Sequence, residues 1–323
     1  MRYVLIDFMH LTYKTFGAVP LSTTVNIGGQ VSVLETTIPN YTIKDIYRYS
    51  KDKEGNRFFT GVFFEGGRPW RREYFRQRES RIAAQEGKVY KGSRENQNSS
   101  FYQQIDLAIV LLDQGKVTCY RQEGMEADDL IASVVALIKS VDTTTPIDII
   151  TNDSDMLPLV DNQVSVYMRG NRTEAVGGAP ERTGYYQVTP ETWHDYLRLS
   201  SKYKQFDIPY NSILLHKLIR GDDSDEVSPA VKGLGPVNYN KLIQRMRDDG
   251  VDFANTFRYW YDFDEVIAPV LSNYFKPEEV ADMRYIYYGI SPRYNALVMP
   301  KQIDSGLLQQ ALNWLHINLH KRD

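Results

Sequence analysis

Three short apolar segments of the sequence each run into an acidic residue. They are RYVLI at 2–6 before Asp7, RFFTGVFF at 57–64 before Glu65, and PIDIIT at 146–151 before Asp153. Segments of this length, rich in β-branched and aromatic residues, predict buried strands. If the strands are parallel, their carboxyl ends share one edge of the sheet, so the three acids would lie close together.

The pattern between these segments favours an α/β fold. KVTCYR at 116–121 predicts a fourth strand, and the apolar spacing over 127–139 predicts a helix after it. Strands that alternate with helices indicate a parallel sheet with helices on its faces. Residues 66–98 are polar and basic, which is typical of an exposed helix and loop, and helices dominate from about residue 186.

Composition sets wider bounds. A chain of 323 residues with 42% hydrophobic content can form one large domain, or a main domain with a smaller lobe. Cys119 is the single cysteine, so an internal disulfide is impossible and a reducing compartment is expected. There is no signal-peptide pattern and no apolar window of ~18 to 20 residues. We therefore expect a cytoplasmic protein with no membrane partner.

The formal net charge of −3 hides a strong local asymmetry. Between Arg68 and Arg94, nine Lys and Arg residues stand against three Glu. Acids gather instead in EADD at 126–129, NDSD at 152–155 and GDDSDE at 221–226. A basic segment that could hold phosphates, together with acidic clusters that could hold divalent metal, is what phosphodiester hydrolysis requires.

Each acidic cluster taken alone has a simpler explanation. Acids in a first helical turn usually stabilise the helix dipole, and NDSD after a strand is often a turn and cap. Together, however, so many carboxylates on one sheet edge need a cation to neutralise them. Oxygen-only ligation favours Mg²⁺ or Mn²⁺, and the five scattered histidines argue against zinc. Two such ions roughly 4 Å apart are a common arrangement for phosphodiester hydrolysis.

Four motifs, in this order, resemble the 5′-nuclease (flap endonuclease and 5′-3′ exonuclease) superfamily. They are LIDFMHLTY, EADDLIAS, IITNDSDMLPLV and GDDSDEVSPAVKGLGPVNYNKLI, and the likeness covers about residues 1–250. It extends to stand-alone phage and bacterial members, including phage ribonuclease H of this type. The resemblance implies a PIN-like parallel sheet flanked by helices in a nuclease core at 1–185, with a helical arch at about 66–100. It also implies a helical lobe at 186–323 with a helix-three-turn-helix at about 221–249.

The resemblance also implies two metal sites. The first would use Asp7, Glu65, Glu126 and Asp128, and the second Asp129, Asp153, Asp155, Asp222 and Asp225. Asp128 could bridge both ions and belongs with the catalytic residues. Glu65 stands where the family usually has Asp, and its longer side chain could bind through water. Asp223 is an additional acid in the same loop, with a solvated position as the alternative.

Further resemblance concerns the basic segment. YKGSR at 90–94 matches the arch signature whose lysine and arginine contact the scissile phosphate, which implies that role for Lys91 and Arg94. Among the 23 tyrosines, Tyr13, Tyr74 and Tyr90 are the candidates for base stacking. WRREYFRQR at 70–78 resembles the arch entry and implies DNA contacts for Arg71 and Arg72. Because the spacing between the two motifs is longer than usual, Arg72, Arg76 and Arg78 stay competitors, and a solvated basic helix is the alternative.

The segment PAVKGLGPVNYNKLI resembles the family's DNA-anchoring turn. Gly233 and Gly235 permit a tight turn whose amides can hold a phosphate, and Lys232 and Lys241 add charge. An ordinary glycine-rich helix connection is the alternative. In the family this loop often holds K⁺, which the resemblance therefore implies here.

The expected function is that of a structure-specific 5′-nuclease. It would act as a 5′-3′ exonuclease and flap endonuclease with two Mg²⁺ ions, for which Mn²⁺ would substitute, in primer removal and flap processing. Expected partners are DNA with 5′ flaps or ends, RNA/DNA primer hybrids, and replication proteins such as single-strand-binding protein or clamp. We expect a monomer, in the host cytoplasm if phage-encoded. The alternatives are a PIN-like ribonuclease and a junction-binding protein with impaired cleavage.

Overall fold

A six-stranded sheet forms the centre of the molecule. A computed structural model of the chain describes residues 2–16, 23–27, 30–34, 41–67, 69–77, 99–115, 117–169, 184–258 and 262–292. The strands are β1 (Tyr3–Asp7), β4 (Phe59–Phe64), β5 (Thr118–Arg121), β6 (Ile147–Ile150), β7 (Val164–Arg169) and β8 (Tyr185–Val188). Their order is β5-β4-β1-β6-β7-β8, and every pairing is parallel except that of β7 with β8.

The predicted α/β class and all four predicted strands are confirmed. β1 lies between β4 and β6, with Asp7 opposite Phe63 and Ile6 opposite Ile150. This register brings the carboxyl ends of the three acid-bearing strands to one edge, as expected. The sequence reasoning did not predict β7 and β8, and β8 makes the sheet mixed instead of purely parallel.

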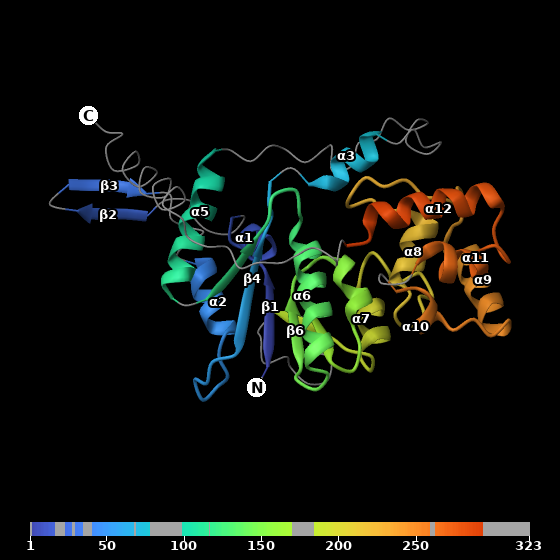
Figure 1. Cartoon of the computed structure of the whole chain (residues 1–323), viewed down its shortest axis with the longest axis horizontal. Coiled ribbons are helices and arrows are strands. Elements are labelled where there is room, and N and C mark those ends of the chain that lie inside the picture. Colours follow the sequence, from blue (N-terminus) through green and yellow to red (C-terminus); the bar gives the residue numbers. More distant parts are fainter. Residues whose placement is uncertain are drawn as a thin grey trace.

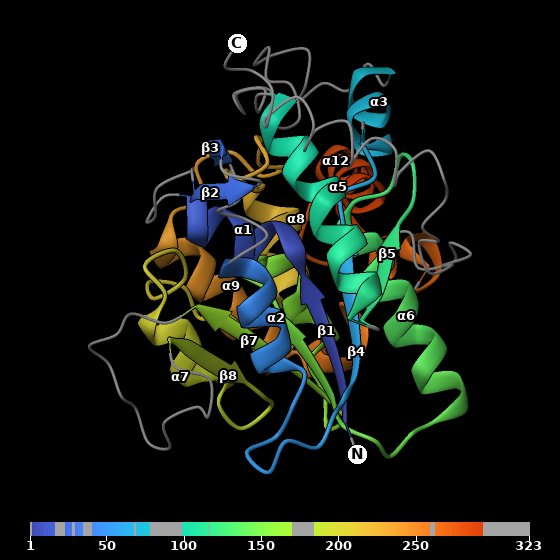
Figure 2. The same cartoon turned by 90° about the vertical axis from the view of Figure 1, so that its left-hand side faces the viewer.

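Helices cover both faces of this sheet (Figures 1 and 2). On one face lie α1 (Phe8–Phe16), α2 (Ile43–Tyr49) and α5 (Ser99–Gln114), and on the other lies α6 (Ala127–Val141). Strand β1 serves both, because Val4 and Ile6 pack on the first side and Leu5 on the second. A separate hairpin, β2 (Thr23–Ile27) and β3 (Gln30–Leu34), stands outside the sheet.

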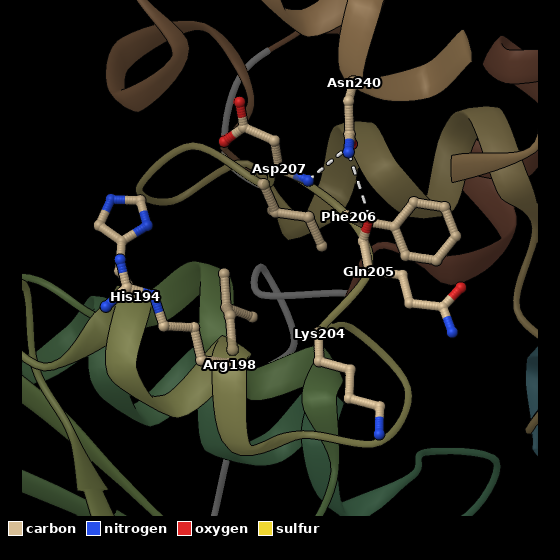
Figure 3. A pocket seen from close by; sticks show the side chains of 9 residues that line it. His194, Arg198, Lys204, Gln205, Phe206, Asp207 and Asn240 are labelled. Atoms are coloured by element: carbon tan, nitrogen blue, oxygen red, sulfur yellow. Dashed lines mark hydrogen bonds between the residues drawn. The ribbon is translucent and has the colours of Figure 1, made fainter. Parts of the chain in front are cut away.

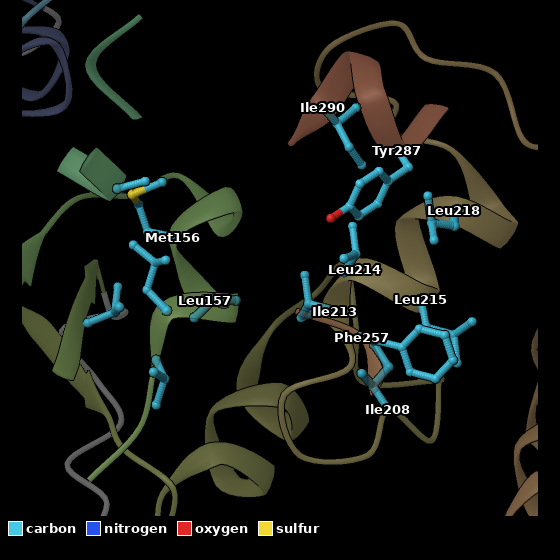
Figure 4. Packing of buried hydrophobic residues seen from close by; sticks show 14 of the residues in the cluster. Met156, Leu157, Ile208, Ile213, Leu214, Leu215, Leu218, Phe257, Tyr287 and Ile290 are labelled. Carbon is cyan, nitrogen blue, oxygen red and sulfur yellow. The ribbon is translucent and has the colours of Figure 1, made fainter. Parts of the chain in front are cut away.

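The described part of the carboxyl-terminal region, from Trp193 onward, is helical, as predicted. After the short 3-10 helix η2 (Ser154–Leu159), its elements are α7 (Trp193–Leu199), α8 (Ile213–Arg220), α9 (Pro236–Asp248), α10 (Phe253–Thr256), the π-helix η3 (Phe263–Ile267), α11 (Ala268–Leu271) and α12 (Pro277–Ile290). Figure 4 shows the centre of this lobe, where Leu214 and Leu218 of α8 face Tyr287 and Ile290 of α12.

One contact joins this lobe to the start of the predicted arch. Helix α3 (Trp70–Gln77) packs on α12: the rings of Tyr74 and Tyr285 stack with centroids 5.3 Å apart, and Phe75 lies against Gly289. Helix α12 also contributes Met283, Ile286 and Ile290 to the larger hydrophobic core. Residues 78–98 of the predicted arch lie outside the described residues. Of the helices described, none is long and apolar enough to cross a bilayer.

Candidate metal and nucleic-acid site

Asp7 and Asp153 meet at the carboxyl edge of the sheet through one threonine. The Thr151 hydroxyl donates to Asp7 Oδ2 at 2.8 Å and accepts from the backbone N–H of Asp153 at 3.0 Å. Thr151 follows β6, whose partner β1 ends at Asp7, so the strand pairing fixes this contact. Two of the predicted ligands are thereby brought together.

Asp7 is a partly buried residue whose carboxyl has a second carboxyl nearby. Burial, together with the neighbouring charge of Asp153, raises the pKa of Asp7 to about 6, although Thr151 and the N–H of His10 donate to it. A carboxyl whose pKa rises among other carboxyls is one that a bound cation would stabilise in its ionised form.

The acids of the EADD motif surround a buried arginine. Arg71 of α3 is 1% exposed and forms ion pairs with Glu126 (2.7 Å), Asp128 (3.1 Å) and Asp129 (2.9 Å) at the start of α6. Trp70 donates its indole N–H to Asp129 Oδ2 at 3.0 Å. The DNA contact predicted for Arg71 stays a prediction, and in this arrangement its side chain serves as a counter-ion.

Asp128 links this cluster to the sheet edge. Burial raises its pKa well above the usual range, the charges of Asp129, Glu126 and Asp153 raise it further, and the charge of Arg71 opposes them. Since the charge of Asp153 acts on both Asp7 and Asp128, these three carboxylates share one electrostatic environment. The bridging role predicted for Asp128 is compatible with this central position.

A second cluster gathers around a lysine that the sequence reasoning missed. Lys217 of α8 is 1% exposed and is ion-paired to both Asp155 and Asp222. Lys202 adds a 3.1 Å ion pair to Asp222. Burial alone would raise the pKa of Asp222, but Lys217 and Lys202 hold it well below its usual range. The available signal was a lysine in the middle of ILLHKLIR, a helix with five apolar residues of eight, just before GDDSD.

Glu65 and Asp225 are the two further predicted ligands. Glu65 follows β4 and is partly buried, and its backbone carbonyl accepts from Arg121 Nε at 3.1 Å. Asp225 is buried in the loop after α8, with its N–H donating to the carbonyl of Asp222 at 3.2 Å. Asp223, between them in sequence, is exposed. The ligand roles of Glu65 and Asp225 stay predictions.

The donor atoms of these residues suit a hard divalent cation, but the side chains are not arranged around a common metal position. Within the described ranges, no three His, Cys, Asp or Glu side chains are grouped so that they would hold a metal ion as they stand. The donors are nevertheless all carboxylate oxygens, which Mg²⁺ and Mn²⁺ prefer. Arg71 neutralises the EADD carboxylates here, and Lys217 neutralises Asp155 and Asp222. A metal at these carboxylates would have to replace those side chains as counter-ion.

The glycine turn has the predicted backbone form. Gly233 has φ +74°, and Gly235 is the residue before α9, whose first residue is Pro236. A Cβ added at either glycine would meet no atom within 4 Å, and the Gly235 N–H donates to the Gly233 carbonyl at 3.0 Å, which closes the turn. Lys232 and Lys241 are exposed nearby. The K⁺ implied for this turn stays a prediction.

Several predicted DNA contacts cannot be placed. Tyr90, Lys91, Arg94 and Arg78 lie outside the described residues, as does the side chain of Arg76. Arg72 lies on α3 and is partly exposed. The choice between Lys91 with Arg94 and the upstream arginines therefore stays open.

Comparisons with solved structures identify the fold. A bacteriophage T5 flap endonuclease, in a complex with DNA and metal ions, matches with a TM-score of 0.56 over 98% of this chain and 99% of that chain, at 13% identity. A T5 protein crystallised with metal ions matches with a TM-score of 0.55 over 98% and 100%, at 15% identity. At these identities the likeness shows the fold alone.

Sequence relatives and a family model agree with each other. DNA polymerase I of Caldicellulosiruptor bescii is 26% identical over 244 residues, 76% of this chain and 24% of that protein. The 5′-3′ exonuclease of Mycoplasma pneumoniae is 29% identical over 167 residues, 51% and 50% of the two chains. The chain thus spans about a quarter of that DNA polymerase I. The model of the 5′-3′ exonuclease N-terminal, resolvase-like domain matches residues 2–184, and since this is more than half of the chain, the chain belongs to that family.

Proposed function

We propose that this chain is a divalent-metal-dependent 5′-nuclease that cleaves phosphodiesters at 5′ ends and 5′ flaps of DNA. The observation that carries the proposal is the gathering of Asp7, Asp128 and Asp153 at one sheet edge, where burial and mutual charge raise the pKa of the first two. Membership of the 5′-3′ exonuclease family supports the reaction class. Primer removal and flap processing in replication are the proposed roles.

Two divalent ions, Mg²⁺ with Mn²⁺ as a substitute, are the proposed cofactors. Bound at these carboxylates, they would supply the Lewis acidity that activates water and stabilises the leaving oxygen. Asp7, Asp128 and Asp153 would hold one side of the site, and Asp155 with Asp222 the other. Metal ions in the T5 structures are consistent with a divalent requirement.

The buried cations have a part in this proposal. Lys217 holds the pKa of Asp222 below its usual range and so keeps it ionised, and Arg71 partly offsets the rise in the pKa of Asp128 that burial causes. If a metal displaced Arg71 from Asp128, the guanidinium would be freed beside the proposed metal site. It could then donate to a phosphate oxygen, which is the DNA contact expected from the sequence.

Substrate choice would come from two separate anchors. The amides of the Gly233–Gly235 turn, with Lys232 and Lys241 beside them, would hold a duplex phosphate at the start of α9. Lys91 and Arg94 of the arch would orient the scissile phosphate of a single-stranded 5′ end. Because both anchors contact phosphate, low sequence preference and steep salt dependence are expected. RNA/DNA primer hybrids and replication proteins are further proposed partners.

The test is cleavage of a 5′-flap duplex labelled at its 3′ end, in Mg²⁺ or in EDTA. We compare the native chain with Asp153→Asn and Lys91→Ala, and use Asp223→Asn as the matched control because Asp223 is exposed in the same acidic loop as Asp222. The proposal expects metal-dependent products at the junction. Asp153→Asn should abolish them, Lys91→Ala should reduce them strongly, and Asp223→Asn should leave them unchanged.

Two results would count against the proposal. Tight binding of the flap without cleavage in Mg²⁺ or Mn²⁺ would leave a junction-binding protein. Cleavage confined to single-stranded RNA, with no dependence on a 5′ end, would favour a PIN-like ribonuclease.

A further inference from the structure

A pocket opens in the helical lobe between α7 and α9. Its cavity volume is about 290 Å³, near the lower end of the ~300 to 1,000 Å³ typical of ligand sites. Figure 3 shows His194 and Arg198 of α7 and Lys204 just beyond it on one side, with Asn240 of α9 opposite. None of these residues belongs to the carboxylate clusters or to the glycine turn.

The charge of this pocket is positive. Among the residues that line it, Asp207 is the single carboxylate, and Arg247 neutralises it through a two-point ion pair, with Nη2 to Oδ1 at 2.7 Å. Arg198 has a 3.5 Å contact with Asp195, but both side chains are largely exposed, so this pair is weak. Arg198 and Lys204 therefore keep their charge available for an anion.

Hydrogen bonds to α9 hold the backbone that forms one wall of the pocket. Asn240 Oδ1 accepts from the N–H of Asp207 at 2.8 Å, and Asn240 Nδ2 donates to the carbonyl of Gln205 at 3.2 Å (Figure 3). Both bonds fix the backbone segment that carries Lys204. A site held in this way needs little reorganisation when a ligand binds.

The same wall is connected to the glycine turn. Phe206, between Gln205 and Asp207, packs against Tyr239 of α9, and the guanidinium of Arg220 lies 5.4 Å from its ring centroid. Arg220 also donates to the carbonyl of Leu234, inside the glycine turn, at 2.7 Å. The pocket and the turn are thus held against each other by one arginine.

The spacing between the glycine turn and the pocket along α9 matches the spacing of phosphates along one DNA strand. Asn240 lies five residues after Gly235, which corresponds to ~7.5 Å of helix axis. One DNA strand carries a phosphate every ~3.4 Å of duplex axis, so the separation is roughly two phosphate steps. With the duplex lying along α9, a phosphate at the glycine turn would bring the following phosphates of that strand toward the pocket.

We propose that this pocket holds the phosphodiester backbone of the DNA duplex beyond the glycine turn, with Arg198 and Lys204 as the phosphate contacts and His194 beside them. This inference rests on the proposed function, since it requires a duplex at α9. It extends the duplex footprint onto α7, a helix to which the sequence motifs assign no role.

The test is fluorescence anisotropy of a labelled 5′-flap duplex in EDTA, where no cleavage occurs, over a series of salt concentrations. The double variant Arg198→Ala/Lys204→Ala is compared with Lys51→Ala/Arg57→Ala, which removes two exposed charges beside the amino end of β4. The pocket variant should bind roughly tenfold more weakly at low salt, and its slope of log K against log salt should fall by about two. The control variant should match the native chain, and melting curves should show that all three are folded.

Three other results of these measurements would overturn the inference. Binding and slope equal to those of the control variant would exclude a duplex contact at the pocket. Binding of inorganic phosphate or a free nucleotide, lost in the pocket variant while its duplex binding stays native, would assign a small-anion site instead. Cleavage of the same flap by the native chain is measured separately in Mg²⁺. If the native chain cleaves the flap and the pocket variant binds the duplex as well as the native chain does, the inference is refuted and the proposed function still stands.

Discussion

Replacing Arg71 with methionine tests whether the EADD carboxylates depend on their buried counter-ion. The guanidinium is 1% exposed and within 3.1 Å of three carboxylates, of which Asp129 is fully buried. Removing one partner of a buried ion pair costs about 3 to 5 kcal/mol, because the opposite charge is left without compensation. Methionine fills much of the same space, so the loss measures mainly the charge.

The assay is urea unfolding at pH 7.5, in EDTA and in Mg²⁺, with Arg284→Met as the matched control. Arg284 pairs with Asp264 at 2.7 Å, but both side chains are about half exposed, so its loss should cost no more than about 1 kcal/mol. In EDTA, Arg71→Met should lose about 3 to 5 kcal/mol. Mg²⁺ at about 100 times its Kd would raise the free energy of unfolding of the variant by about 2.7 kcal/mol. It would raise that of the native chain by less, because Arg71 competes with the metal for the carboxylates.

Two results would refute this reasoning. If Arg71→Met is no less stable in EDTA than Arg284→Met, the buried cluster does not need its arginine. If Mg²⁺ stabilises the native chain and Arg71→Met equally, the arginine and the metal do not share ligands. The second result would also weaken the proposed assignment of Asp128 as a metal ligand.

Three further predictions concern stability and are measured by urea unfolding. Burial and two nearby cations lower the pKa of His216 to about 3, so the free energy of unfolding of the native chain should fall by about 2 kcal/mol from pH 7 to pH 5, as the imidazole is protonated only in the unfolded state. His216→Phe should remove that part of the loss, and an unchanged pH profile in this variant would contradict the prediction. Gly221→Ala should cost clearly more than Gly250→Ala, because both have positive φ but only at Gly221 would the Cβ meet a backbone carbonyl, at 2.2 Å; equal costs would show that the loop yields. Gly289→Ala should cost about 1 to 3 kcal/mol because its Cβ would lie 2.3 Å from the Phe75 ring, and Phe75→Leu in the same chain should recover part of it, whereas simple additivity would argue against this contact.

Much of the architecture could be read from local sequence patterns. Apolar runs that end in Asp7, Glu65 and Asp153 predicted parallel strands, and the confirmed register of β1 with β4 and β6 places these acids at one edge. This works because the carboxyl ends of parallel strands share an edge whatever their order. Strands β7 and β8 were missed: VSVYMR of β7 carries a readable strand pattern, whereas YYQV of β8 is too short to show one and is ordered by its antiparallel pairing with β7.

The sequence by itself determined the family, the acidic edge and the glycine turn, because strand, helix and turn signals depend on residues close together in the chain. Only the tertiary structure decided which cation neutralises which acids. Arg71 lies 55 residues from Glu126 and Lys217 lies 62 residues from Asp155, yet each pair is buried and in contact. Like charges brought together need a counter-ion, but sequence spacing does not say which side chain the packing of α3 and α8 will deliver.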